Sequence, residues 1–360
     1  MSLDFADLLL EVIERNASDL HLTAGAHPTV RVRGRLMALE DYPIMTTEQT
    51  REIVYSILTN DQRQRLETDW QIDFAYAVPN QARFRVNAYY QRAAIGAAFR
   101  LIPFSIKTID ELGLPTVLHE LARRPRGFVL VTGPTGSGKS TSLAAVVDEI
   151  NETREEHIMT IEDPIEFLHG HKKCIVNQRE IGSDAKSFGM GLKSALRQDP
   201  DVILVGEMRD LETIHTALTA AETGHLVFAT LHTQDTPQTI DRIIDVFPAE
   251  QQQQVRVQLS VALQGIVTQQ LLPTADGAGR IAACEVLLAT PAIRNLIREG
   301  KTHQIYSSLQ TGGNIGMQTM DAALATLVRA GKITSKLAES RSSTPEELRR
   351  LLGADSFTMT

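Results

Sequence analysis

The chain has 360 residues, of which 42% are hydrophobic and 22% are charged, and its formal net charge at pH 7 is −8. That length accommodates two or three domains, and the acidic balance argues against a protein that coats nucleic acid. No run of eighteen apolar residues predicts a membrane-spanning helix, and the acidic first residues lack a signal-peptide pattern. Two distant cysteines, Cys174 and Cys284, form neither a disulfide framework nor a four-cysteine zinc site. We therefore expect a cytoplasmic protein that contacts a membrane only through partners.

The N-terminal part of the chain mixes helical and strand patterns. Such a mixture of helices and antiparallel strands predicts a small α+β domain, to which we assign residues 1–101. The next segment, 102–116, contains Pro103, Gly113 and Pro115 and is the predicted linker. The predicted helices are residues 3–15, 47–58 and 61–67, and the predicted strands are residues 19–22, 29–33, 72–78, 82–90 and 93–101.

Arginines gather in and between the last two predicted strands of this domain, as Arg83, Arg85, Arg92 and Arg100. Because side chains alternate along a strand, Arg83 and Arg85 share one face. Two interpretations are open. The arginines form a solvated basic face, or they reach the phosphates of a nucleotide bound by this subunit or a neighbour. In the second case a guanidinium would stabilise the charge on a transferred phosphoryl group.

A glycine-rich loop is the most specific motif in the chain. Residues 133–141 fit the pattern G-x-x-x-x-G-K-[ST], and they follow a short apolar run, 128–132, that is typical of a buried parallel strand. A helical pattern begins after the loop. Backbone N–H groups of such a loop cradle nucleotide phosphates, while Lys139 reaches the β- and γ-phosphates and Ser140 binds Mg²⁺. The predicted nucleotide-binding residues are Gly133, Pro134, Thr135, Gly136, Ser137, Gly138, Lys139, Ser140 and Thr141.

Two acidic positions follow predicted strands further along the chain. Residues 158–161 predict a strand that ends in an acidic cluster, where Glu162 or Glu166 could orient and deprotonate an attacking water. Residues 201–207 predict a buried strand that ends at Glu207, a position suited to Mg²⁺ or to water. The carboxyl ends of parallel strands form the edge of an open α/β sheet at which ligands bind.

Two histidines flank a fourth predicted strand within residues 225–233. His232 follows its carboxyl end and could contact a γ-phosphate, although a purely structural role is the alternative; His225 precedes the strand. Residues 213–223 predict a crossover helix. Strands and helices that alternate in this way predict a doubly wound α/β sheet around a nucleoside triphosphate, which we assign with a C-terminal helical part to residues 117–360.

Taken together, these motifs resemble those of the secretion ATPase superfamily, and in particular the PilT-like motors of type IV pilus retraction. Residues 133–141 are similar to the Walker A loop of that family, 161–166 to its aspartate box, 204–210 to its atypical Walker B segment and 224–233 to its histidine box. The N-terminal segment 18–22 resembles the start of the family's sequences. The resemblance implies a homohexameric ring of RecA-like P-loop NTPase domains, each preceded by a small PAS-like α+β domain.

The same resemblance implies roles for individual residues. Glu162 is implied to be the catalytic glutamate and Glu207 the Walker B glutamate beside Mg²⁺, while His225 and His232 form the histidine-box pair. ATP would bind between the two domains of a subunit, with Lys139 at its phosphates. The arginines implied to close over the nucleotide are Arg85, Arg92 and Arg100.

Three features favour the retraction branch of the family. The chain is short, it lacks a four-cysteine zinc element, and residues 292–299 resemble a segment tied to retraction, although their spacing alone predicts only an amphipathic helix. The implied partners are an inner-membrane platform protein and possibly a paralogous retraction ATPase, without nucleic acid. The alternatives are a pilus assembly ATPase, a type II secretion ATPase and an accessory retraction paralogue. No role is assigned to the tail after Ser340.

Overall fold

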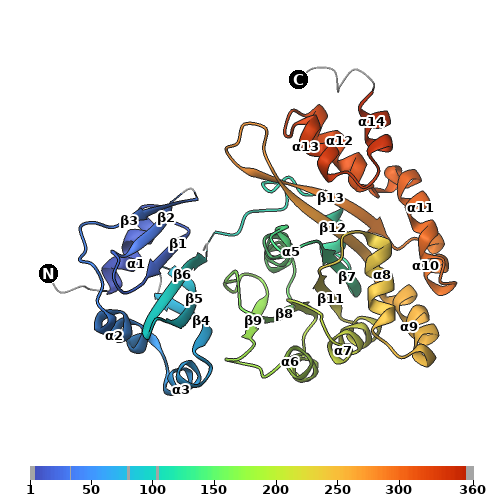
Figure 1. Cartoon of the computed structure of the whole chain (residues 1–360). Helices are drawn as coiled ribbons and strands as arrows, with labels where there is room; N and C mark the ends of the chain where they lie inside the picture. Colours follow the sequence, from blue (N-terminus) through green and yellow to red (C-terminus); the bar gives the residue numbers. More distant parts are fainter. Residues whose placement is uncertain (1–4, 33, 79–81, 103–104, 354–360) are drawn as a thin grey trace. The chain divides into compact units, whose positions relative to one another are not determined.

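The structure of the chain is a computed structural model, which describes residues 5–353 except 33, 79–81 and 103–104 (Figure 1). Parts of two predictions, Pro103 of the linker and the first residues of the helix at 3–15, lie outside the described residues. The chain divides into two compact units, which comprise residues 1–105 with 164–168 and residues 106–163 with 169–360. None of the helices described is both long enough and apolar enough to cross a bilayer.

The first unit contains a six-stranded sheet with the strand order β3-β2-β1-β6-β5-β4, in which the paired strands are antiparallel. Alternation along β5 buries Phe84 and exposes Arg85, and Phe84 packs edge-to-face against Phe99 in the core. Capping boxes at Thr46 and Thr59 begin α2 and α3. The elements are α1 (Phe5–Glu14), β1 (Asp19–Leu22), β2 (Thr29–Val32), β3 (Arg35–Ala38), α2 (Thr47–Ile57), α3 (Asn60–Asp69), β4 (Gln71–Val78), β5 (Ala82–Gln91) and β6 (Ala94–Ile102).

The second unit is organised around a seven-stranded sheet with the order β13-β12-β7-β11-β10-β8-β9. Neighbouring strands are parallel except for the antiparallel pair β12 and β13. The strands are β7 (Gly127–Thr132), β8 (His157–Glu162), β9 (Ile175–Glu180), β10 (Val202–Val205), β11 (Leu226–Leu231), β12 (Leu263–Pro273) and β13 (Arg280–Leu288).

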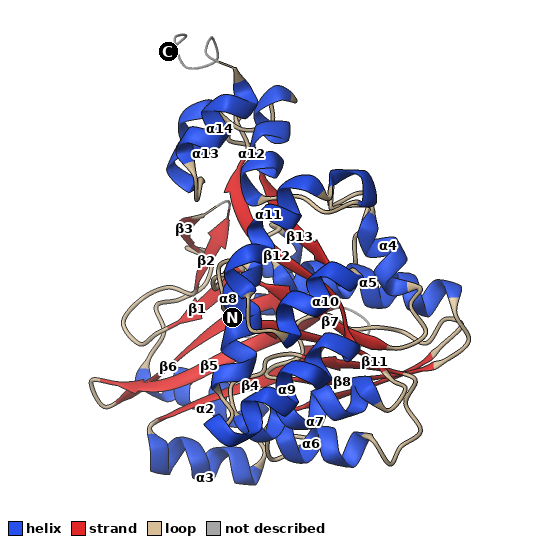
Figure 2. Cartoon of the chain, turned by 90° about the vertical axis from the view of Figure 1, so that its right-hand side faces the viewer, coloured by secondary structure: helices blue, strands red, loops and turns tan. Residues whose placement is uncertain are grey.

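Helices cover both faces of this sheet, because the side chains of its buried strands alternate between two cores. Phe128 and Leu130 of β7 pack in the core with helices α6 to α11, whereas Val129 and Val131 pack in the core with α4 and α5. In the view of Figure 2, α9 lies in front of the strands. This arrangement confirms the predicted doubly wound α/β fold. The covering helices are α4 (Val117–Ala122), α5 (Lys139–Thr153), α6 (Phe188–Ala195), α7 (Leu211–Glu222), α8 (Thr236–Asp245), α9 (Ala249–Ala262), α10 (Pro291–Arg298) and α11 (Ile305–Thr311).

The last helices form a separate small core over the β12–β13 hairpin. Leu324 and Leu348 pack there against Leu272 of β12 and Ala283 of β13. The remaining elements are η1 (Thr302–Gln304), η2 (Gly313–Ile315), α12 (Met320–Arg329), α13 (Ser335–Arg341) and α14 (Pro345–Leu352). The tail after Ser340, to which the sequence assigned no role, therefore includes a helix that is packed on this hairpin.

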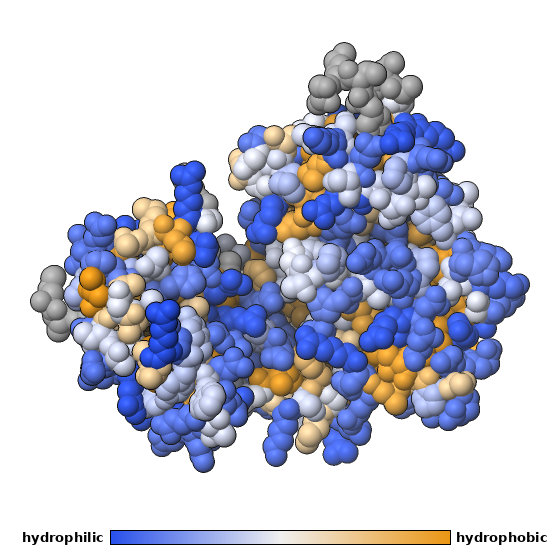
Figure 3. Space-filling model, in the orientation of Figure 1, coloured by the Kyte–Doolittle hydropathy of each residue, from blue (hydrophilic) through white to orange (hydrophobic). Residues whose placement is uncertain are grey.

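Cys174 and Cys284 are both buried and unpaired. Hydrophilic side chains cover most of the face shown in Figure 3, where hydrophobic surface occurs in separate patches.

Candidate active site

The glycine-rich loop joins β7 to α5, as the motif predicts. Gly133 has φ +137° and Gly138 has φ +88°, a backbone region that side chains rarely adopt. Space is also restricted. A Cβ at Gly133 would lie 2.2 Å from the carbonyl oxygen of Gln269, and one at Gly138 would lie 2.9 Å from the amide nitrogen of Gln269. The backbone of β12 therefore leaves room only for glycine at 133, whereas at 138 the positive φ is what favours glycine.

The polar groups of the loop suit the phosphates of a nucleotide. Lys139 begins α5 and is almost fully buried, and its Nζ donates hydrogen bonds to the carbonyl oxygens of Gly133 and Pro134, at 2.8 and 3.1 Å. Ser137 is 3% exposed, and its buried hydroxyl has no hydrogen-bond partner among the described residues. Ser140 lies half-buried in the first turn of α5, whose backbone N–H groups have no partner within the helix. A buried cation, a buried hydroxyl and helix-terminal N–H groups form a donor set that matches phosphate oxygens.

The sheet topology brings the predicted acidic residues and His232 to the edge at which the loop lies. β7 pairs with β11, β11 with β10, and β10 with β8, all in parallel, so the carboxyl ends of these strands meet at one edge. Glu162 is the last residue of β8, and His232 directly follows β11. Glu207 lies two residues beyond the end of β10, so the predicted strand at 201–207 was too long at this end.

Two side chains orient Glu162. Its Oε1 accepts hydrogen bonds from the hydroxyl of Thr160, at 2.6 Å, and from the amide of Gln178 on the adjacent strand β9, at 3.1 Å. The carboxylate is half-buried. A carboxylate fixed in this way at the ligand-binding edge of the sheet can direct a water molecule, as a general base must.

Glu207 has a different environment. His232 Nε2 lies 2.8 Å from Glu207 Oε1, and Arg209 Nη2 donates to Oε2 at 2.6 Å. Burial raises the pKa of the Glu207 carboxyl, but the hydrogen bond from Arg209 and the charge of His232 outweigh burial, and the pKa lies below its ordinary value. Glu207 is therefore ionised at neutral pH, which suits binding of a cation better than proton abstraction.

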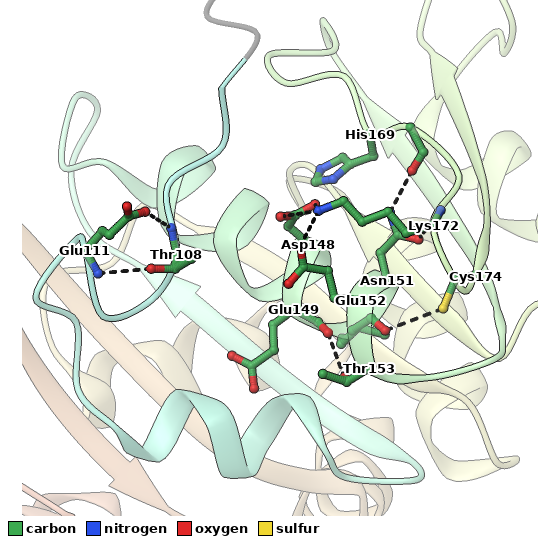
Figure 4. A network of polar contacts seen from close by, with 12 residues as sticks. Thr108, Glu111, Asp148, Glu149, Asn151, Glu152, Thr153, His169, Lys172 and Cys174 are labelled. Carbon is green, nitrogen blue, oxygen red and sulfur yellow. Dashed lines mark hydrogen bonds and ion pairs between the residues drawn. The ribbon is translucent and has the colours of Figure 1, made fainter.

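A polar network fixes the loop that leads into β9 (Figure 4). Asn151 of α5 donates to the carbonyl oxygen of Gly170, and Lys172 pairs with Asp148 and Glu152 on the same helix. The helix that begins at the phosphate loop is thus tied to the strand that carries Gln178, the partner of Glu162.

Comparison with known proteins identifies the family to which the chain belongs. A family model described as "Type II/IV secretion system protein" matches residues 3–285 of the chain. The chain belongs to the type II/IV secretion system protein family.

Members of this family include close relatives of known role. The type IV pilus retraction ATPase PilT of Pseudomonas aeruginosa is 52% identical over 344 residues, which cover 96% of this chain and 99% of PilT. The type IV pilus ATPase PilU of the same organism is 44% identical over 356 residues, covering 98% and 93% of the two chains. A crystal structure of the pilus retraction motor PilT with bound ADP superimposes with a TM-score of 0.91 at 52% identity, covering 97% of this chain and all of that one.

One residue of the predicted catalytic set lies away from the others. His225 precedes β11, so six residues of strand separate it from His232, a span of roughly 20 Å. Its Nδ1 lies 3.0 Å from the carbonyl oxygen of Ala220, the residue that also accepts the His225 backbone N–H. Within one chain, His225 therefore lies at the opposite end of β11 from His232, and a role for it at the nucleotide stays a prediction.

The predicted arginines belong to the first unit of this family member. Arg100 pairs with Asp19 on the neighbouring strand β1, with 2.9 Å between Nε and Oδ1. Arg92 lies in the turn between β5 and β6, at φ +48°, and Arg85 is exposed on β5. A role of these three arginines at the nucleotide stays a prediction.

The structure also shows residues in contact with the predicted site that sequence reasoning missed. Thr160 and Gln178 hold Glu162, Arg209 pairs with Glu207, and Gln269 contacts the phosphate loop. Arg209 lies within the Walker B-like segment, so the motif pointed to its position. A polar pair between apolar residues of a strand, as at Gln269 and Gln270, is the signal that could have indicated the contact with the loop.

Proposed function

We propose that this chain is a Mg²⁺-dependent ATPase that powers retraction of type IV pili and twitching motility. The observation that carries the proposal is the meeting of the phosphate loop, Glu162 and the Glu207–His232 pair at one edge of the sheet. It is supported by 52% identity to the retraction ATPase PilT over nearly the full length of both chains.

The residues of the site divide the chemistry between them. Residues 133–141 bind the ATP phosphates, and Lys139 balances charge that develops on the γ-phosphoryl group. Glu162 positions the attacking water and accepts its proton. A bound Mg²⁺ would neutralise phosphate charge, and the Ser140 hydroxyl and the ionised Glu207 are the residues that would hold it. His232 holds the Glu207 carboxylate in place, with 2.8 Å between its Nε2 and Oε1 of Glu207.

Mechanical work is performed by an assembly of several copies of the chain. Six copies form a ring at the cytoplasmic face of the inner membrane and act on a platform protein of the pilus. The domains are residues 1–101 and 117–360, joined by 102–116. Closure of the first domain over ATP, and its release after hydrolysis, provides the motion. The arginines that we expect to close over the nucleotide are Arg85, Arg92 and Arg100.

The alternative within the family is an accessory retraction paralogue. Identity to PilU is 44%, against 52% to PilT, and this difference favours the principal retraction motor. A pilus assembly or type II secretion ATPase is a second alternative. The phenotype of a deletion separates it from the principal retraction motor and from the accessory retraction paralogue.

The decisive experiment deletes the gene in its host and counts surface pili and twitching. We expect excess pili without twitching, restored by the wild-type chain and by Glu166→Gln, but not by Glu162→Gln. Glu166 is the matched control because it is exposed in the same acidic segment. Loss of pili on deletion would instead identify an assembly ATPase, and normal twitching with normal piliation would contradict a principal retraction role.

A further inference from the structure

Gln269 connects the central sheet to the phosphate loop through both ends of its amide. Its Nε2 donates to the carbonyl oxygen of Ser137 at 2.7 Å, and its Oε1 accepts the hydroxyl of Ser142 at 2.9 Å. The side chain is 2% exposed. The carbonyl oxygen of Ser137 can only accept, so it requires the Nε2 end of the amide to face the loop, and the hydroxyl of Ser142, in the first turn of α5, donates to the other end.

The strand that carries Gln269 is firmly placed. β12 runs parallel to β7, with Thr268 opposite Thr132, the last residue of β7. The hydroxyls of these two buried threonines lie 2.8 Å apart. Gln269 therefore projects from a fixed position beside the start of the loop, and the glycines at 133 and 138 allow the loop to approach it closely.

The hydrogen bond to Ser137 has a directional consequence. In a planar trans peptide, the carbonyl oxygen of one residue and the N–H of the next point in opposite directions. When Gln269 holds the Ser137 carbonyl, the N–H of Gly138 must point away from Gln269. In loops of this kind, the backbone N–H groups are the groups that bind the phosphates. The contact therefore selects one of two orientations of the peptide between Ser137 and Gly138.

We propose that Gln269 is a positioning residue for phosphate binding, which holds the Ser137–Gly138 peptide with its N–H directed at the nucleotide. This inference rests on the proposed nucleotide chemistry of the loop. A residue at 269 must donate to Ser137 and accept from Ser142 at once. Methionine has a similar length but forms neither bond, and glutamate keeps the acceptor while turning a carboxylate oxygen toward the Ser137 carbonyl.

The test compares the purified full-length chain with Gln269→Met, Gln269→Glu and Ser142→Ala. Gln270→Met is the matched control, because the next side chain along the strand points to the opposite face. Four quantities are measured for each protein: the Kd of Mg-ADP by calorimetry, the KM and kcat of ATP hydrolysis, and the melting temperature without nucleotide.

We expect Gln269→Met to raise the Kd for ADP and the KM for ATP about tenfold, with kcat within about threefold of wild type. Gln269→Glu raises the Kd for ADP and the KM for ATP at least as much, because a carboxylate oxygen of the glutamate then faces the carbonyl oxygen of Ser137. Ser142→Ala has a smaller effect, about threefold, since the bond to Ser137 is kept. Gln270→Met binds ADP as wild type does.

Two results would overturn the inference. One is wild-type Kd and KM in Gln269→Met. The other is a lowered melting temperature and a smaller active fraction with unchanged KM, which is the signature of a purely structural residue. Failure of the wild-type chain itself to bind ADP or hydrolyse ATP would instead remove the proposed function, so the two failures are distinguishable.

Discussion

At the scale of single residues, the acidic cluster that begins at the last residue of β8 contains two glutamates with different surroundings. Glu162 receives hydrogen bonds from Thr160 and Gln178, whereas Glu166 is exposed. We expect Glu162→Gln to lower the kcat of ATP hydrolysis by about 10²- to 10⁴-fold, because the amide cannot accept a proton from water. ADP binding should be retained. Steady-state hydrolysis assays with Glu166→Gln as the control check this, and a larger loss in the control would transfer the role to Glu166.

Glu207 leads to a prediction about pH. Burial raises its pKa, but Arg209 and His232 outweigh burial and keep the pKa below the ordinary 4.5. A carboxyl whose pKa is lower in the folded than in the unfolded chain stabilises the fold above the ordinary value, and this contribution is lost as the pH falls through the lowered pKa. Below about pH 4.5, the melting temperature of the wild type should therefore fall more steeply than that of Glu207→Gln. Melting curves recorded from about pH 7 to pH 3 test this, and parallel profiles would count against it.

At the scale of elements, the helix that resembles a retraction segment has a clear packing role. Ile293 and Ile297 of α10 are buried in a core of the second unit. Arg294 donates to the carbonyl oxygens of Ser260 and Val261 at the end of α9, at 2.6 Å for Val261, so its side chain caps that helix.

The two arginines of α10 should therefore differ on substitution. Arg294→Met leaves helix-terminal carbonyls without their donor, and we expect it to lower the free energy of unfolding by about 1–3 kcal/mol, which lowers the melting temperature by a few degrees. Arg298 is exposed, and Arg298→Met should leave the melting temperature unchanged. If Arg298→Met nevertheless abolishes twitching, that side chain faces a partner. Equal melting temperatures for both variants would refute the capping role.

The elements that sequence patterns predicted are those with strong local signals. The apolar runs that became β7, β10 and β11 are buried on both faces, and the glycine loop marks the start of α5. β12 was missed because Thr268, Gln269 and Gln270 interrupt its apolar pattern. Burial of Thr268 and Gln269 depends on Thr132, Ser137 and Ser142, which are distant in sequence, so local periodicity carried no signal for it. The motif match alone did not indicate the distance between His225 and His232, which lie at opposite ends of β11.

At the scale of the whole molecule, nucleotide chemistry should depend on the first unit. Arg85 is exposed on β5, and Arg35 is exposed on β3 of the same sheet. We expect Arg85→Ala to lower kcat at least tenfold at an unchanged melting temperature, because a guanidinium that stabilises transition-state charge is lost. Arg35→Ala should retain full activity. Hydrolysis assays on the assembled protein check the pair, and equal rates would leave Arg85 as part of a solvated face.

The buried cysteines give the molecule an experimental advantage. Burial raises the pKa of Cys284 to about 12 and also raises that of Cys174, and reaction with alkylating reagents requires the thiolate. Maleimide dyes should therefore not react with the two native thiols, and they should couple to cysteines introduced on the surface. A donor dye on the first unit and an acceptor on the second would then follow, molecule by molecule, how the distance between them changes through each cycle of ATP hydrolysis.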